Sequence, residues 1–176
     1  MTNFTYVSEM NEAFGNPQGD PKNIDWPKVR RQCLSILDEF IELQKALGLR
    51  EEDTLTALAY ARSLLTVAKY ELPELNQVRD GLCDIHVFGY GAHHLMGIDA
   101  DRDMVEVVDK VMTRFIKDEA DEAATIAKHA AKGVTEVYLE GEYPRRILKS
   151  AAEQPDAPVG KFLKSASFQE PEFYEV

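Results

Sequence analysis

Two predicted helices carry pairs of carboxylates inside otherwise apolar segments. In ILDEFIEL, Glu39 and Glu42 are three residues apart, with Asp38 beside them; in VRDGLCDIHVF, Asp80 and Asp84 are four residues apart. Residues at these spacings share one face of a helix. If the two faces meet, their oxygen atoms form a cage of the kind that binds Mg²⁺ or Mn²⁺. The spacing therefore predicts a metal cage built from four to five carboxylates, among Asp38, Glu39, Glu42, Asp80 and Asp84.

Other interpretations of these residues compete with the metal cage. Charged residues are mostly exposed, so each pair could belong to a solvated acidic face; the apolar neighbours of both pairs bring the cage level with that interpretation, and both stay open. A di-iron bundle would need Glu-x-x-His on two helices, and no ExxH occurs in the chain. The sequence also contains no phosphate-binding GxxxxGK[ST], no GxGxxG and no GxSxG. Cys33 and Cys83 lie among apolar residues and are interpreted as inert core cysteines.

Composition limits the possible partners. The chain has 176 residues, 44% of them hydrophobic, and a formal net charge of −11. This length suits one domain with a sizeable core. The acidic balance disfavours a nucleic acid polymer and an anionic membrane surface as partners. With two cysteines and no signal-peptide pattern at its start, the chain is expected to be cytoplasmic.

The elements that must position these residues are mostly helices. Helical spacing and capping residues predict segments at 6–14, with Ser8 as N-cap, at 26–47, from 53 or 54 to about 70, at 73–96, and from about 99 to 132 in one or two pieces. The apolar residues after Leu82 predict a central position for the fourth segment. TEVYLEGEYPRRILKS alternates and predicts a hairpin, and VGKFLKS is a candidate third strand. We therefore predict a mostly α fold, a four-helix-type bundle, as one domain over 1–176 with 134–176 as hairpin and tail.

Four segments, taken in order, resemble a known family. They are VSEMNEAFGNP, RRQCLSILDEFIEL, VRDGLCDIHVFGYGAHHLMGID and VGKFLKSASFQEPEF. They look like the F-x-x-A-F-G segment, the E-E-x-x-E helix, the A-D-x-x-x-D…G…G-[IL]-D helix and the D-G-K-x-x-K…F-x-P tail of the MazG-like, all-α nucleoside triphosphate pyrophosphohydrolases. The likeness is to the phage-type branch of that superfamily, which is also similar to phosphoribosyl-ATP pyrophosphohydrolase.

The resemblance implies an activity and a set of residue roles. The implied reaction cleaves a nucleoside triphosphate, NTP or dNTP, between its α- and β-phosphates and yields a monophosphate and pyrophosphate. Mg²⁺ would be held by Glu39, Glu42 and Asp84, with Asp80 joining them because the family's further acidic position falls on Gly81. Glu39 would also be catalytic. The resemblance further implies a homodimer or homotetramer, in the host cytoplasm if the protein is phage-encoded.

Asp38 stands where the family has its first Glu. It is predicted to be a catalytic residue, either as a further metal ligand or as the group that orients the attacking water.

The chain departs from the family pattern in DKVMTRF. Val111 replaces the usual Asn, and Arg114 replaces the usual Lys. Arg114, Lys161 and Lys164 are the candidate phosphate-binding cations, and ordinary surface cations are the competing interpretation. Two further hypotheses remain open. One is a catalytically degenerate protein that binds or sequesters a nucleotide, and the other is an acidic helical bundle without a ligand.

Overall fold

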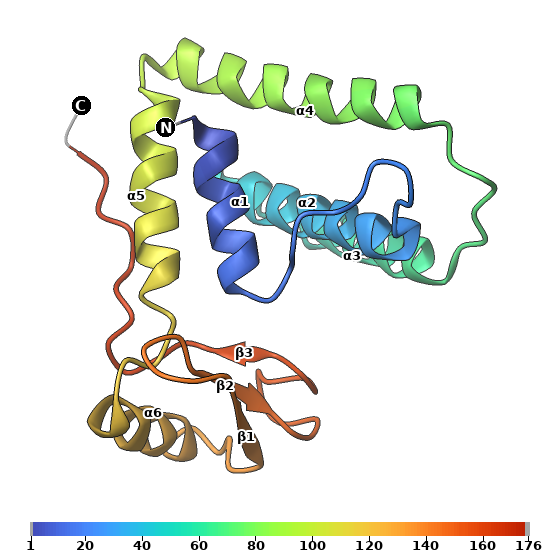
Figure 1. Cartoon of the computed structure of the whole chain (residues 1–176). Coiled ribbons are helices and arrows are strands. Elements are labelled where there is room, and N and C mark those ends of the chain that lie inside the picture. Colours follow the sequence, from blue (N-terminus) through green and yellow to red (C-terminus); the bar gives the residue numbers. More distant parts are fainter. Residues whose placement is uncertain (1, 175–176) are drawn as a thin grey trace. The chain divides into compact units, whose positions relative to one another are not determined.

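The computed structural model describes residues 2–174 as mostly helical, with a small antiparallel sheet near the C-terminus (Figure 1). The helices are α1 (Asn3–Ala13), α2 (Trp26–Ala46), α3 (Glu52–Val67), α4 (Leu75–Met96), α5 (Ala100–Met112) and α6 (Glu119–Ala130). The strands are β1 (Val137–Glu140), β2 (Ile147–Ser150) and β3 (Phe162–Leu163), in the order β1-β2-β3. The mostly α class and the C-terminal hairpin are thereby confirmed, and VGKFLKS does supply a third strand.

The chain divides into two compact units. The first consists of Met1–Gln18 together with Phe88–Val176, and the second is Gly19–Val87. Because α4 runs from Leu75 to Met96, its residues contribute to both units. The acidic pairs all belong to the second unit, and the candidate phosphate-binding cations all belong to the first.

Capping residues set several helix boundaries. Asp25 accepts a hydrogen bond from the Lys28 amide at the start of α2, where Pro27 occupies the first turn. Gly48, with φ +99°, follows the end of the same helix. The expected start of α1 is wrong: Thr2, and not Ser8, is the N-cap, and its hydroxyl accepts from the Thr5 amide. The helix therefore begins at Asn3.

The core of the first unit lies where the sheet meets the link between α5 and α6. Its buried apolar residues are Ile116, Val134, Leu148, Ala157 and Leu163. The N-terminal helix reaches this region through a cluster of aromatic rings: the Phe14 ring lies 4.7 Å from that of Phe115 and 5.1 Å from that of Phe162. Helix α1 also packs beside α5 (Figure 1). Three segments distant in sequence are thus joined by apolar contact.

Polar contacts fix the segment after β3. The Thr125 hydroxyl on α6 accepts from the Ala166 amide at 2.8 Å, and the Ser167 hydroxyl donates to Asp121 at 2.9 Å. Further on, the Glu172 amide donates to Glu106 of α5. These contacts hold the C-terminal segment against both α5 and α6.

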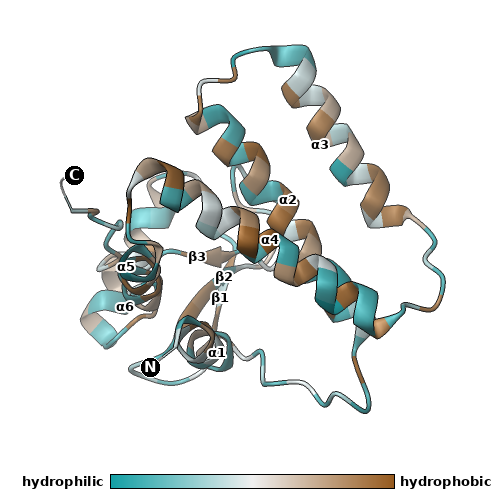
Figure 2. Cartoon of the chain, turned by 90° about the horizontal axis from the view of Figure 1, so that it is seen from above, coloured by the Kyte–Doolittle hydropathy of each residue, from teal (hydrophilic) through white to brown (hydrophobic). Residues whose placement is uncertain are grey.

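The second unit has no comparable core. Helices α2 and α3 pack side by side (Figure 1), yet none of the residues of α2, α3 and α4, all of which the structure describes, is buried. Hydrophobic residues recur along these helices (Figure 2), and several are open to solvent, including Val67 at 78%, Phe88 at 76% and Leu95 at 87% exposure. The predicted central position of the fourth segment is therefore wrong within one chain, and the four-helix-type bundle is not confirmed.

Both cysteines lie on helices of the second unit. Cys33 and Cys83 are exposed free thiols, so their interpretation as core cysteines is wrong, for the reason that α2 and α4 bury no side chain.

Within residues 2–174, no helix is long and apolar enough to cross a membrane.

Candidate functional site

The predicted metal ligands lie on two helices of the second unit. Glu39 and Glu42 are on α2, Asp80 and Asp84 are on α4, and all four residues are exposed. None of the ion pairs formed by residues 2–174 involves them. Their carboxylate oxygens are the right donors for a hard cation. Among the described residues, however, no three His, Cys, Asp or Glu side chains form a group that could hold a metal. The donor type fits Mg²⁺, whereas the geometry of a single chain does not close the predicted cage.

Asp38 has a partner that sequence reasoning did not assign. Arg62 of α3 binds both of its oxygens, with Nε to Oδ1 at 2.9 Å and Nη2 to Oδ2 at 3.0 Å. This hydrogen bonding, helped by the negative charge of Asp38, raises the pKa of Arg62. The pair connects α2 to α3, so Asp38 has a structural contact besides its predicted catalytic role. Arg62 shares a helical stripe with Leu58 and Leu65, which predicts an inward-facing arginine but does not identify Asp38 as its partner.

The Asp38–Arg62 pair is expected to contribute modestly to stability. Asp38→Asn and Arg62→Gln should each lower the free energy of unfolding by up to about 1 kcal/mol, because the two side chains are 45% and 36% exposed and water screens their charges. The double variant should lose less than the sum of the two, as expected of contacting residues. Urea denaturation of the four proteins measures this coupling. Strictly additive losses would show that the pair is not formed in solution.

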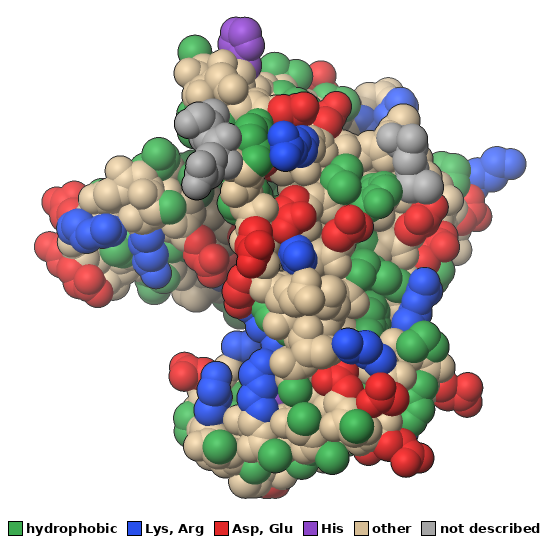
Figure 3. Space-filling model, turned by 90° about the vertical axis from the view of Figure 1, so that its left-hand side faces the viewer, with side chains coloured by type: hydrophobic (Ala, Val, Ile, Leu, Met, Phe, Trp, Pro, Cys, Tyr) green, Lys and Arg blue, Asp and Glu red, His purple; other side chains and the backbone are tan. Residues whose placement is uncertain are grey.

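The structure brings together two of the three candidate phosphate-binding cations. The Arg114 guanidinium carbon lies 5.5 Å from the centre of the Phe168 ring, and the Lys164 ammonium lies 4.2 Å from it. Lys161 instead donates to the backbone oxygen of Asp156 at 2.6 Å. Figure 3 shows several Lys and Arg side chains on the lower part of the face in view, with Asp and Glu side chains among them. Phe168 was not singled out from sequence, because nothing local marks an aromatic residue as a partner of two distant cations.

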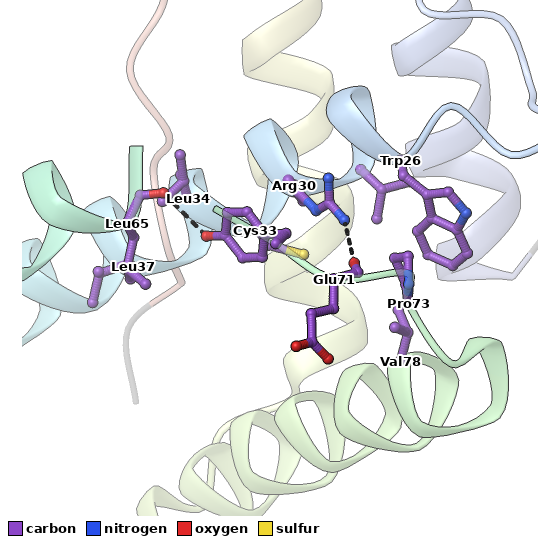
Figure 4. Close-up of a pocket in the computed structure, with 11 residues that line it drawn as sticks. Trp26, Arg30, Cys33, Leu34, Leu37, Leu65, Glu71, Pro73 and Val78 are labelled. Carbon is purple, nitrogen blue, oxygen red and sulfur yellow. Dashed lines mark hydrogen bonds between the residues drawn. The ribbon is translucent and has the colours of Figure 1, made fainter. Parts of the chain in front are cut away.

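A separate apolar pocket of about 310 Å³ lies in the second unit, between α2, the end of α3 and the start of α4 (Figure 4). Its lining includes Trp26, Cys33, Leu37, Leu65 and Val78. The cation at its edge, Arg30, is already engaged, because it stacks on Tyr70 at 4.5 Å and donates to the backbone oxygen of Glu71 at 3.2 Å. None of the predicted site residues lines this pocket.

Comparisons with known proteins identified no relative of this chain. No protein-family model matches the chain, and neither a curated protein nor a solved structure matches it. The resemblance to the MazG-like pyrophosphohydrolases therefore stays a prediction that rests on the four sequence segments.

Proposed function

We propose that this protein is a divalent-metal-dependent nucleoside triphosphate pyrophosphohydrolase. It would cleave an NTP or dNTP between the α- and β-phosphates, in the cytoplasm, and release a monophosphate and pyrophosphate. The observation that carries the proposal is that the carboxylate pairs of α2 and α4 are exposed and open to a cation from solvent. Asp38 is neutralised by Arg62, whereas Glu39, Glu42, Asp80 and Asp84 take part in none of the ion pairs within residues 2–174.

The residue types suit a metal–triphosphate substrate. Enzymes that transfer phosphoryl groups rely on positioning and charge neutralisation more than on covalent chemistry. Glu39, Glu42, Asp80 and Asp84 are the proposed ligands of Mg²⁺ or Mn²⁺, with Asp38 and Glu39 in the catalytic roles that the family resemblance implies. Arg114 and Lys164, with Lys161, are the proposed phosphate-binding cations.

The proposal includes a second copy of the chain. A homodimer or homotetramer would cover exposed apolar side chains of α2, α3 and α4. Helices from two copies would then form the four-helix-type bundle expected from the sequence. A second copy would also bring further carboxylate pairs to these helices, which supports completion of the metal site by assembly.

The proposal is tested by incubating the protein with a panel of NTPs and dNTPs, with and without Mg²⁺. Pyrophosphate and monophosphate should appear only when the metal is present. Release of orthophosphate with a nucleoside diphosphate would indicate cleavage at the wrong bond. Hydrolysis that is unaffected by chelation would contradict the metal requirement.

A second candidate is a protein that binds a nucleotide without hydrolysing it. It is favoured by the lack of a three-ligand metal group among residues 2–174 and by Val111 at the family's Asn position. The same panel discriminates the two candidates. Calorimetric binding of a triphosphate with no release of pyrophosphate, over hours and with Mg²⁺ present, would establish the second.

Metal addition should stabilise the protein. In the proposed assembly the carboxylates of α2 and α4 would come together and repel one another without a cation, so millimolar Mg²⁺ or Mn²⁺ is expected to raise the melting temperature. The expected gain in the free energy of unfolding is about 1–3 kcal/mol when the metal is at 10 to 100 times its dissociation constant. Differential scanning calorimetry with and without a chelator at low salt measures it. Identical melting curves would exclude a metal cage in the folded protein.

A further inference from the structure

Arg114 carries a charge without an anionic partner among the residues that the structure describes. Its Nε atom is covered and has no hydrogen-bond partner among residues 2–174, and none of the ion pairs of those residues includes it. A guanidinium stays charged at any physiological pH, and covering its N–H groups without an acceptor is unfavourable. The sequence contains 31 Asp and Glu residues, so acceptors are abundant. The covered Nε atom is closed to an anion from solution, which would therefore have to bind the terminal Nη atoms of Arg114.

The Phe168 ring lies against both Arg114 and Lys164. The distances of 5.5 Å and 4.2 Å from the ring centre are within the range in which an aromatic face attracts a cation. Two positive side chains repel each other when they are brought close together. The negative face of the ring opposes that repulsion, because it attracts both charges. One aromatic side chain therefore keeps two cations in the same neighbourhood.

The backbone around Phe168 is anchored to residues next to Arg114. The Ser165 hydroxyl donates to the backbone oxygen of Thr113 at 2.8 Å, and the Ser165 amide donates to that of Arg114 at 3.3 Å. On the other side of Phe168, the Gln169 amide donates to the Thr113 hydroxyl at 2.9 Å. The position of the ring relative to Arg114 is consequently defined from both sides.

We infer that Phe168 is a positioning residue that holds Arg114 and Lys164 as a paired site for phosphate oxygens. The inference rests on the proposed function for the identity of the natural ligand, a nucleoside triphosphate. Arg114 would bind two oxygens through its planar fork, and Lys164 would act as a compact charge. Inorganic pyrophosphate, which carries the same groups without a nucleoside, is the simplest probe of this pair.

Glu170 is the competitor of such an anion. Its carboxylate lies 2.8 Å from the Lys164 ammonium, and the two side chains are 72% and 41% exposed. An exposed pair of this kind is weak, and the ammonium retains two further donors. Removal of the competing charge by Glu170→Gln should therefore strengthen pyrophosphate binding.

The inference is tested by titrating inorganic pyrophosphate into the full-length protein in a calorimeter, without divalent metal and at low salt. Phe168→Leu, which removes the ring but retains an apolar side chain, should weaken binding about 3- to 30-fold. Phe168→Tyr should restore it, and Glu170→Gln should bind more tightly than the wild type. In triphosphate hydrolysis, Phe168→Leu should raise KM by a similar factor with little change in kcat.

Phe173→Leu is the matched control, because Phe173 lies in the same C-terminal segment and is 58% exposed. It should bind pyrophosphate as the wild type does. Wild-type affinity in Phe168→Leu, an equal loss in Phe168→Leu and Phe168→Tyr, or no pyrophosphate binding by the wild type would each overturn the inference. Pyrophosphate binding without triphosphate hydrolysis would contradict the proposed function alone. Hydrolysis that is insensitive to Phe168→Leu would contradict only the role of Phe168.

Discussion

Replacement of Glu42 by glutamine is expected to lower triphosphate hydrolysis by about two orders of magnitude or more. The substitution keeps the size and hydrogen-bonding shape of the side chain but removes one negative charge from the proposed metal ligands. Loss of a few kcal/mol of charge stabilisation in the transition state corresponds to a decrease of this size. Glu42 is exposed and takes part in none of the ion pairs formed by residues 2–174, so we expect the Glu42→Gln variant to keep its fold. Steady-state release of pyrophosphate measures the effect.

Asp84→Asn should cause the same loss from α4, and it tests whether both acidic pairs serve one site. Glu52→Gln is the matched control, since Glu52 is an exposed glutamate of the same unit, in the first turn of α3. Glu51 is less suitable, because its carboxylate accepts from the Thr54 hydroxyl. Circular dichroism and light scattering should show unchanged fold and assembly in all three variants. Full Mg²⁺-dependent activity in Glu42→Gln and Asp84→Asn would refute the metal site. Unfolding of both variants would show that the acidic pairs serve the stability of the fold and not metal binding.

Replacement of Phe14 by alanine should lower the free energy of unfolding by about 3 kcal/mol, near the lower end for loss of a core aromatic side chain. The half-buried Phe14 ring joins α1 to Phe115 and to Phe162 of β3, so its removal leaves a cavity among three segments of the first unit. For a chain of this length, the melting temperature should fall by roughly 6–12 °C. Thermal unfolding followed by circular dichroism at 222 nm, near the helical minimum, measures it.

The control for Phe14 lies on α1, the helix that Phe14 follows as its C-cap residue. Phe4 is 73% exposed, so Phe4→Ala should change the free energy of unfolding by no more than about 0.5 kcal/mol. Equal small shifts in both variants would show that α1 does not depend on the aromatic cluster. A large shift in Phe4→Ala would instead point to a contact made by the exposed face of α1, such as a second copy of the chain.

Local physical rules account for the parts of the fold that could be predicted. Asp25 and Pro27 mark the start of α2, and Gly48 follows its end, because capping and positive φ are properties of a few adjacent residues. The alternation in TEVYLEGEYPRRILKS likewise predicted the pairing of β1 with β2. The start of α1 was misplaced because Ser8 and Thr2 are both acceptable caps. Which of two caps is used depends on the remaining contacts of the helix.

The candidate site was predictable only where it depends on helix periodicity. The spacing of Glu39 with Glu42, and of Asp80 with Asp84, places each pair on one face whatever the tertiary structure. The partner of Asp38 was not predictable, because Arg62 lies 24 residues away and many arrangements of two helices are compatible with the sequence. The contact between Phe168 and Arg114 was not predictable for the same reason, because the two residues lie far apart in the sequence.

The sequence alone therefore determined the mostly α class, the C-terminal hairpin and the faces on which the carboxylates lie, since these follow from interactions between neighbours along the chain. Tertiary structure decided which charges are neutralised within the chain and which are not. In the folded chain Asp38 pairs with Arg62, and Arg114 and Lys164 both contact the Phe168 ring. Apolar side chains of α2, α3 and α4 remain exposed to solvent. These outcomes depend on packing between distant segments, where apolar burial and the pairing of charges are settled together.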